Sequence, residues 1–184
     1  MSALQVIPEP SSHALTVVRE HQDSSRSSSQ EFLSCQLGGV SYGIPLRCVQ
    51  EIRSYEAPTQ IANAPAWVKG IVDLRGVIVP IVDLRMSFEL PQVNYDALTV
   101  TVVLQLRERV IGVVVDSVSD VLALSGPQIK PAPSFSHALD AGYIAGIGTP
   151  DAEDTQRMLI LLDIERLLGG AAMGLLPAEL QPLN

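Results

Sequence analysis

The stretch FLSCQLGGVSYGI, residues 32–44, decides the fold because apolar and polar residues alternate along it. The apolar residues that fall on one face are Leu33, Cys35 and Leu37. A period of two is typical of a half-buried strand. The Gly-Gly pair at 38–39 tolerates positive φ angles, and the alternation resumes at Val40. This stretch therefore predicts a β-hairpin.

The same pattern returns 69 residues later without a gap. The matching pairs are Leu33 and Val102, Leu37 and Leu106, Gly43 and Gly112, Val49 and Val118, Glu51 and Asp120, and Ile52 and Val121. Residues 69–71 recur at 145–147 and residues 79–84 at 159–164, so the offset grows from 69 to 76 to 80. Val-rich strands resemble one another by chance, but the collinear order, with Gly or Asp in register, favours a structural duplication with loop insertions.

Each copy contains about five strand-like segments, which are too short to form an open sheet with protected edges. Closing each set into a small barrel removes those edges. We therefore expect an all-β fold of two packed, five-stranded SH3-like or OB-like β-barrels, at about 31–92 and 93–166. The remaining helix is expected in short pieces, at Asn63–Lys69 and in a C-terminal helix at about 164–176.

The two ends of the chain are predicted to lie outside this domain. Residues 1–30 contain eight serines and two prolines without sustained periodicity, which favours a disordered tail. Residues 177–184 are expected to form a second tail, so the domain itself spans 31–176.

Composition excludes several classes of protein. The 184 residues carry 12 basic against 20 acidic side chains, so nucleic acid is disfavoured as a partner. The longest apolar stretch, Leu167–Ala178, is broken by glycines and a proline and falls short of the roughly 20 residues of a membrane-spanning helix. No signal peptide is apparent, and Cys35 and Cys48 alone do not form a disulfide framework, which favours a reducing cytoplasm.

No pattern in the sequence predicts catalysis, a metal site or a cofactor site. The candidates considered are His137 in a Ser-rich turn, the carboxylates Asp116 and Asp120, the acidic loop Asp151, Glu153 and Asp154, and the glycines Gly146 and Gly148. Each lacks the convergence or spacing that its chemistry needs. A binding or scaffold module remains.

The stretch NAPAWVKGIVDLRGVIVPIVDL, residues 63–84, closely resembles the signature of the CheW-like family of bacterial chemotaxis coupling proteins. Flanking segments agree with the same family: QEFLSCQLGGVSYGIPLRCVQEIRSY, VIGVVVDSVSDVLAL, IKPAPSF and RMLILLDIERLL. The resemblance runs from about Gln30 to Leu176 and implies a pair of five-stranded barrels. Asp73 departs from the family's usual Asn, which bears on hydrogen bonding in the turn.

The resemblance implies a non-enzymatic adaptor without cofactors. Such proteins bridge the cytoplasmic tip of methyl-accepting chemoreceptors and the regulatory domain of the histidine kinase CheA. They are cytoplasmic and associate with polar or membrane-attached receptor arrays. The family positions linked to receptor binding are Val49, Glu51, Gly70, Arg75, Val100, Val118 and Val121 in this sequence.

Two geometric expectations follow for these positions. Val49 and Val118 should approach each other across the barrel interface, with Val100 and Val121 nearby. Arg75 should sit at the tip of a tight turn and pair with Glu51 across the groove.

Two alternatives remain open. One is a coupling protein of a related chemosensory pathway that controls pili or another output. The other, from a different class, is a small β-barrel ligand-binding protein or enzyme with its site between the barrels.

Overall fold

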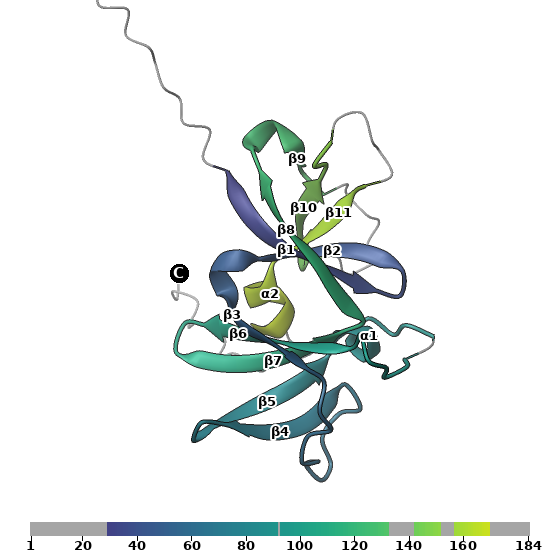
Figure 1. The fold of residues 1–184 in the computed structure, drawn as a ribbon, viewed down its shortest axis with the longest axis vertical. Coiled ribbons are helices and arrows are strands. Elements are labelled where there is room, and N and C mark those ends of the chain that lie inside the picture. Colours follow the sequence, from purple (N-terminus) through teal and green to yellow (C-terminus); the bar gives the residue numbers. More distant parts are fainter. Residues whose placement is uncertain (1–28, 92, 133–141, 152–156, 170–184) are drawn as a thin grey trace, which may run out of the picture.

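The computed structural model describes residues 29–91, 93–132, 142–151 and 157–169, which form two packed β-sheets (Figure 1). The upper sheet has the strand order β8-β1-β2-β11-β10-β9 and the lower sheet has the order β3-β6-β7-β5-β4. The strands are β1 (Gln30–Leu37), β2 (Val40–Pro45), β3 (Val49–Ser54), β4 (Val68–Leu74), β5 (Val77–Asp83), β6 (Val100–Leu106), β7 (Arg109–Val115), β8 (Ser117–Leu124), β9 (Ile129–Lys130), β10 (Ile144–Gly148) and β11 (Leu159–Leu162). The helical pieces are η1 (Leu46–Cys48), α1 (Leu84–Ser87), η2 (Gly126–Gln128) and α2 (Ile164–Gly169).

The predicted all-β class with short helices is confirmed. The hairpin predicted at residues 32–44 is formed by β1 and β2, with Leu37 opposite Val40 and positive φ angles at Gly38 and Gly39. The lower sheet has the expected five strands. The upper sheet has six because the two-residue strand β9 pairs with β10.

The duplication is visible in the strand orders, but the two copies exchange their first hairpins. Each sheet combines the first two strands of one copy with the later strands of the other, so β1 pairs with β8 and β3 pairs with β6. The chain passes between the sheets at η1 and again at Asp116, between β7 and β8. The two equivalent crossover pairings, β5 with β7 and β11 with β2, are parallel.

This exchange contradicts the predicted division into consecutive barrels at 31–92 and 93–166. Residues 31–92 supply two strands to the upper sheet and three to the lower sheet, and the second copy supplies the rest. The physical reason is that a repeat fixes the type and order of strands, whereas either copy of a strand satisfies the same alternating burial pattern.

One helix prediction was wrong and another is confirmed at its start. Residues 62–67 form turns, Asn63 has a φ of 61°, and Val68 begins β4 opposite Val82, so no helix forms at Asn63–Lys69. Helix α2 begins at the predicted residue, Ile164, and is described to Gly169. The rest of the predicted 164–176 helix, residues 1–28 and the tail at 177–184 lie outside the described residues.

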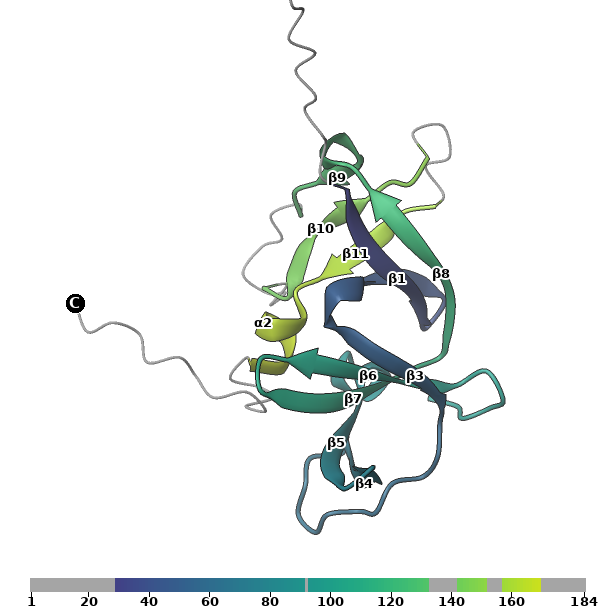
Figure 2. The ribbon, with the colours of Figure 1, turned by 60° about the vertical axis from the view of Figure 1, so that its left-hand side comes forward.

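Residues from both sheets and α2 share the main core. Helix α2 lies between the sheets in both views and buries Ile164, Leu167 and Leu168 (Figures 1 and 2). Their spacing of three and four residues places all three side chains on one helix face. The core around them is aliphatic, in keeping with an aromatic content of 4%.

Candidate functional site

The β4–β5 hairpin ends in a two-residue turn at Arg75 and Gly76. Leu74 lies opposite Val77, and the φ angles of 56° at Arg75 and 85° at Gly76 match the turn type that suits a twisted hairpin. Asp73 accepts a hydrogen bond of 2.6 Å from the Gly76 N–H with its Oδ1 atom. The carboxylate at this position, where the family commonly has Asn, therefore fills the acceptor role in the turn.

Arg75 and Glu51 form the ion pair that the sequence predicted. Nη2 of Arg75 lies 2.9 Å from Oε2 of Glu51 on β3, and Nη1 of Arg53 lies 3.7 Å from the other carboxylate oxygen. The Arg75 side chain is 75% exposed and that of Glu51 is 23% exposed. Because water screens the arginine, the pair contributes at most about 1 kcal/mol to stability. Its effect is geometric, since it connects the hairpin tip to an edge strand of the same sheet.

The four predicted valines lie on β3, β6 and β8. Val49, Val100 and Val118 are half-buried and pack against the main core, whereas Val121 is 50% exposed. Strands β3 and β8 occupy the edges of their sheets, and in Figure 2 both run toward the right, away from α2.

The strand register brings one of these valines close to the start of β8. Val100 lies opposite Ser54 on one side and Val115 on the other, and β8 starts two residues after Val115. The predicted approach of Val49 to Val118 stays a prediction.

Gly70 differs from the other predicted site residues because it is buried and has a structural reason of its own. Its φ is 138°, and a Cβ atom there would lie 2.0 Å from the Thr59 carbonyl oxygen. It lies at a register shift between β4 and β5, and its repeat counterpart Gly146 lies at the equivalent shift between β10 and β11. Gly70 therefore shapes the hairpin that carries Arg75 instead of offering a side chain to a partner.

A buried charge network, which the sequence did not predict, links the two sheets. Arg85 is fully buried and donates to both oxygens of Asp83, at 3.0 Å from Nε and 2.8 Å from Nη2. Its Nη1 atom donates to Asp116 at 2.9 Å and to the Asn94 carbonyl oxygen at 2.7 Å. Tyr95 completes the network by donating to Asp83 at 2.7 Å.

The network is satisfied throughout, which keeps Arg85 charged. Burial alone lowers the pKa of the guanidinium, but its hydrogen bonds to Asp83 and Asp116 outweigh burial, and the pKa is raised above its ordinary value. Sequence reasoning considered Asp116 only as half of a carboxylate pair. The available signal was an unbalanced one: two acids in strand-end positions and a basic residue one position after a buried Leu84.

The rejected chemical candidates are separated in the structure where it describes them. Asp116 accepts from Arg85, whereas Asp120 is exposed on β8, so the two form no carboxylate pair. His137, Glu153 and Asp154 lie outside the described residues. Within the described ranges, His, Cys, Asp and Glu side chains form no group of three that could hold a metal ion. In that same part of the chain, helices are too short or too polar to cross a membrane.

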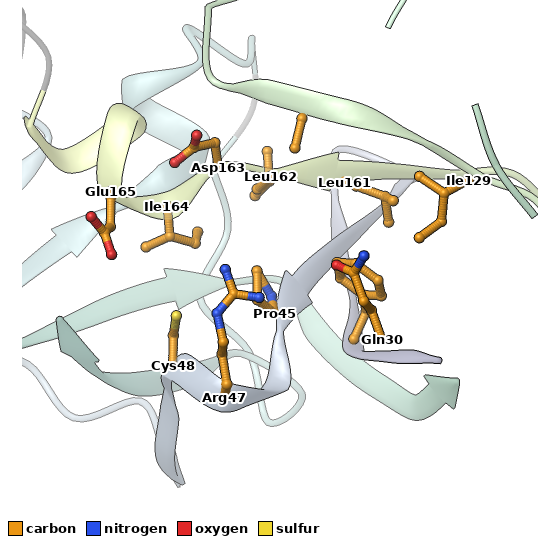
Figure 3. Close-up of a pocket in the computed structure, with 12 residues that line it drawn as sticks. Gln30, Pro45, Arg47, Cys48, Ile129, Leu161, Leu162, Asp163, Ile164 and Glu165 are labelled. Carbon is orange, nitrogen blue, oxygen red and sulfur yellow. The ribbon is translucent and has the colours of Figure 1, made fainter. Parts of the chain in front are cut away.

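One surface pocket of about 360 Å³ lies in the upper sheet, at the end of β11 (Figure 3). Apolar side chains form its floor, and charged side chains lie on its rim. The lining includes Phe32, Ile129, Leu161 and Cys48, together with Arg47, Asp163 and Glu165. The pocket lies apart from the Arg75–Glu51 pair, which belongs to the lower sheet.

Comparison with known proteins gives a consistent result. Residues 31–172 match the model of the CheW-like domain. The chain is 51% identical over 146 residues to the chemotaxis protein CheW of Klebsiella aerogenes, covering 79% of this chain and 86% of that protein. It is 31% identical over 138 residues to the probable chemotaxis protein CheW of Rhizobium etli, covering 75% and 86%.

The chain belongs to the CheW-like family. A solved structure, the scaffolding protein TtCheW from Thermoanaerobacter tengcongensis, shares the fold with a TM-score of 0.69 at 22% identity, covering 78% of this chain and 95% of that one. Membership of the CheW-like family confirms the prediction of a chemotaxis adaptor that is not an enzyme.

Proposed function

We propose that this protein is an adaptor that couples chemoreceptors to the histidine kinase CheA. The Arg75–Glu51 contact of 2.9 Å carries this proposal, because it joins two positions that the family links to receptor binding. The match to CheW proteins of other bacteria supports the same role. The protein then acts in the cytoplasm, at receptor arrays that are polar or attached to the membrane.

The receptor-binding face consists of the Arg75–Glu51 pair and the valines on β3, β6 and β8. A chemoreceptor tip is a helical hairpin, and a helix binds by placing an apolar stripe against an apolar groove. Val121, which is 50% exposed, and the half-buried Val49, Val100 and Val118 supply apolar contact area. Glu51 and Arg75 then fix the border of the face, and Gly70 acts through the backbone of the hairpin.

Contact with the regulatory domain of the kinase uses a different part of the surface. That domain has the same two-barrel fold in the family, so the two proteins can alternate head to tail. Such heterologous contacts close into a ring when the rotation permits. Weak contacts suffice, because tethering in an array raises the effective concentration of each module.

A reconstitution tests the adaptor role directly. Kinase autophosphorylation is measured with receptor present, with and without this protein. We expect the kinase to respond to receptor only when the protein is added. An equal response in both cases would overturn the proposal.

A double-mutant cycle tests the receptor face. Receptor capture is measured for Arg75→Ala, Glu51→Ala and the double variant. Since the pair acts as one unit, we expect the double variant to lose little more than either single variant. Additive losses would show that the two residues act independently.

A related pathway is the second candidate. The chain is 26% identical over 139 residues to the protein FrzA of Myxococcus xanthus, which supports this alternative less strongly than the 51% match supports chemotaxis. Reconstitution with kinases of each pathway separates the two, because only the cognate kinase responds.

A further inference from the structure

The pocket at the end of β11 has an exact counterpart in the other half of the duplication. The offset of 80 residues relates Asp163 to Asp83 and Glu165 to Arg85. The backbone N–H of each aspartate donates a bond of 2.8 Å, from Asp163 to Tyr143 and from Asp83 to Trp67. Each aspartate also caps the short helix that follows, since its Oδ1 atom accepts a backbone N–H at 3.0 Å. The same local structure is therefore built twice.

In the first half, the segment that follows the helix covers this site. The chain reverses after α1 at Glu89, which has a φ of 54°, and the Leu90 N–H donates to the Arg85 carbonyl oxygen. The segment then places Tyr95 over Asp83, with its ring 4.7 Å from the Arg85 guanidinium. As a result, the Asp83 side chain is 0% exposed.

In the second half, the described residues leave the site open. The Asp163 side chain is 36% exposed, and the space beside it is the pocket of about 360 Å³. Figure 3 shows Asp163, Ile164 and Glu165 on one side and Arg47 with Cys48 facing them. Apolar walls from Phe32, Ile129 and Leu161 continue the pocket away from the charges. A side chain that fills it must therefore be mainly apolar.

We propose that the segment following α2 occupies this pocket, with Leu175 and Leu176 as the inserted side chains. Leu175 stands 80 residues after Tyr95, at the same distance that relates the two aspartates. Gly169 stands 80 residues after Glu89, where the first half reverses its chain with a positive φ, and glycine adopts that conformation with less strain than any other residue.

The composition of the segment suits this occupant. Residues 170–178, GAAMGLLPA, carry no charge and belong to the longest apolar stretch of the sequence. A leucine needs no polar partner, and Asp163 does not require one, because Arg166 already donates to it from the backbone. Nine residues span the distance easily, since the segment starts directly after the helix whose first turn lines the pocket.

The two cysteines provide a readout of this contact in the full chain. Cys48 lines the pocket and is 8% exposed, whereas Cys35 is 0% exposed in the core. Modification of each thiol by N-ethylmaleimide is followed by mass spectrometry. In Leu175→Asp with Leu176→Asp, the charges oppose insertion, and we expect Cys48 to react at least about fivefold faster while Cys35 stays slow.

Two matched variants control for charge and for shape. Leu180→Asp with Leu183→Asp carries the same charges further along the chain and should leave the Cys48 rate within about twofold of the wild type. Leu175→Met with Leu176→Met keeps the apolar volume and should keep Cys48 protected.

Two outcomes would overturn the proposal. Equal Cys48 rates in the aspartate variants and the wild type would mean that these leucines do not cover the pocket. Equal acceleration of Cys48 and Cys35 would mean that the substitutions open the whole domain. Neither readout involves a receptor or kinase, so this test stands apart from those of the proposed function.

Discussion

Nη1 of Arg85 lies 2.9 Å from Oδ1 of Asp116, and this contact fastens the end of one sheet to the point where the chain crosses to the other. The second Asp116 oxygen accepts the Gly38 N–H at 2.7 Å, from the β1–β2 turn of the upper sheet. One carboxylate therefore connects the helix after β5 with a hairpin of the opposite sheet. The relative position of the sheets, and with it the face that carries Val100 and Val118, depends on this link.

Removing the guanidinium should destabilise the whole domain. Arg85→Met leaves Asp83 and Asp116 without their charged partner, and breaking a buried pair in this way costs about 3–5 kcal/mol in the free energy of unfolding. Denaturant unfolding measures the loss. Arg53→Met, which removes a 40% exposed arginine at 3.7 Å from its partner, should change stability by less than about 1 kcal/mol. A loss at Arg85 no larger than that at Arg53 would contradict the importance of the network.

Substitution of Gly70 should cost more than its backbone conformation alone explains. Gly70→Ala places a Cβ atom 2.0 Å from the Thr59 carbonyl oxygen, whereas Gly39→Ala meets nothing within 4 Å. Both glycines have positive φ angles, so each substitution pays about 1–2 kcal/mol for the left-handed region. Thermal unfolding should show a larger loss for Gly70→Ala, and equal losses would mean that β4 relaxes without cost.

A surface substitution should separate receptor binding from folding. Val121→Asp alters a 50% exposed side chain of the proposed receptor face, so we expect receptor capture to weaken at least about tenfold while the melting temperature changes little. Val40→Asp is the matched control, because Val40 is 44% exposed and lies outside that face. Similar weakening in both variants would point to a general effect of charge.

The stability of the protein should fall at alkaline pH because of a buried thiol. Burial, assisted by the negative charge of Asp116, raises the pKa of Cys35 to about 12. Above the ordinary thiol value near 8.5, the unfolded chain releases this proton while the folded chain retains it. The free energy of unfolding is therefore at its full value below pH 8.5 and falls, by up to about 1.4 kcal/mol per pH unit, toward pH 12.

Cys35→Ala provides the control for this pH dependence. The variant loses packing at every pH, but the contribution of this thiol to the slope between pH 9 and 11 should disappear. Parallel stability curves for the wild type and Cys35→Ala would contradict the assignment.

The sequence predicted local structure better than it predicted partnership. Alternation and turn residues located the β1–β2 hairpin, and the resemblance located the Arg75–Glu51 pair, which the structure contains at 2.9 Å. The exchange of hairpins was not predictable, because equivalent strands have interchangeable burial patterns. Arg85 was missed because its partners, Asp83 and Asp116, approach it only through the packing of α1 against β7.

The hairpin exchange means that neither copy of the repeat owns a complete sheet. A polypeptide cut in the connection near residue 92 would yield two pieces, each with strands whose hydrogen-bonding partners reside on the other piece. Neither piece alone can satisfy those backbone groups, but the mixture can. The molecule is thus a single cooperative unit built like a pair of clasped hands, and its two pieces should regain structure only by associating.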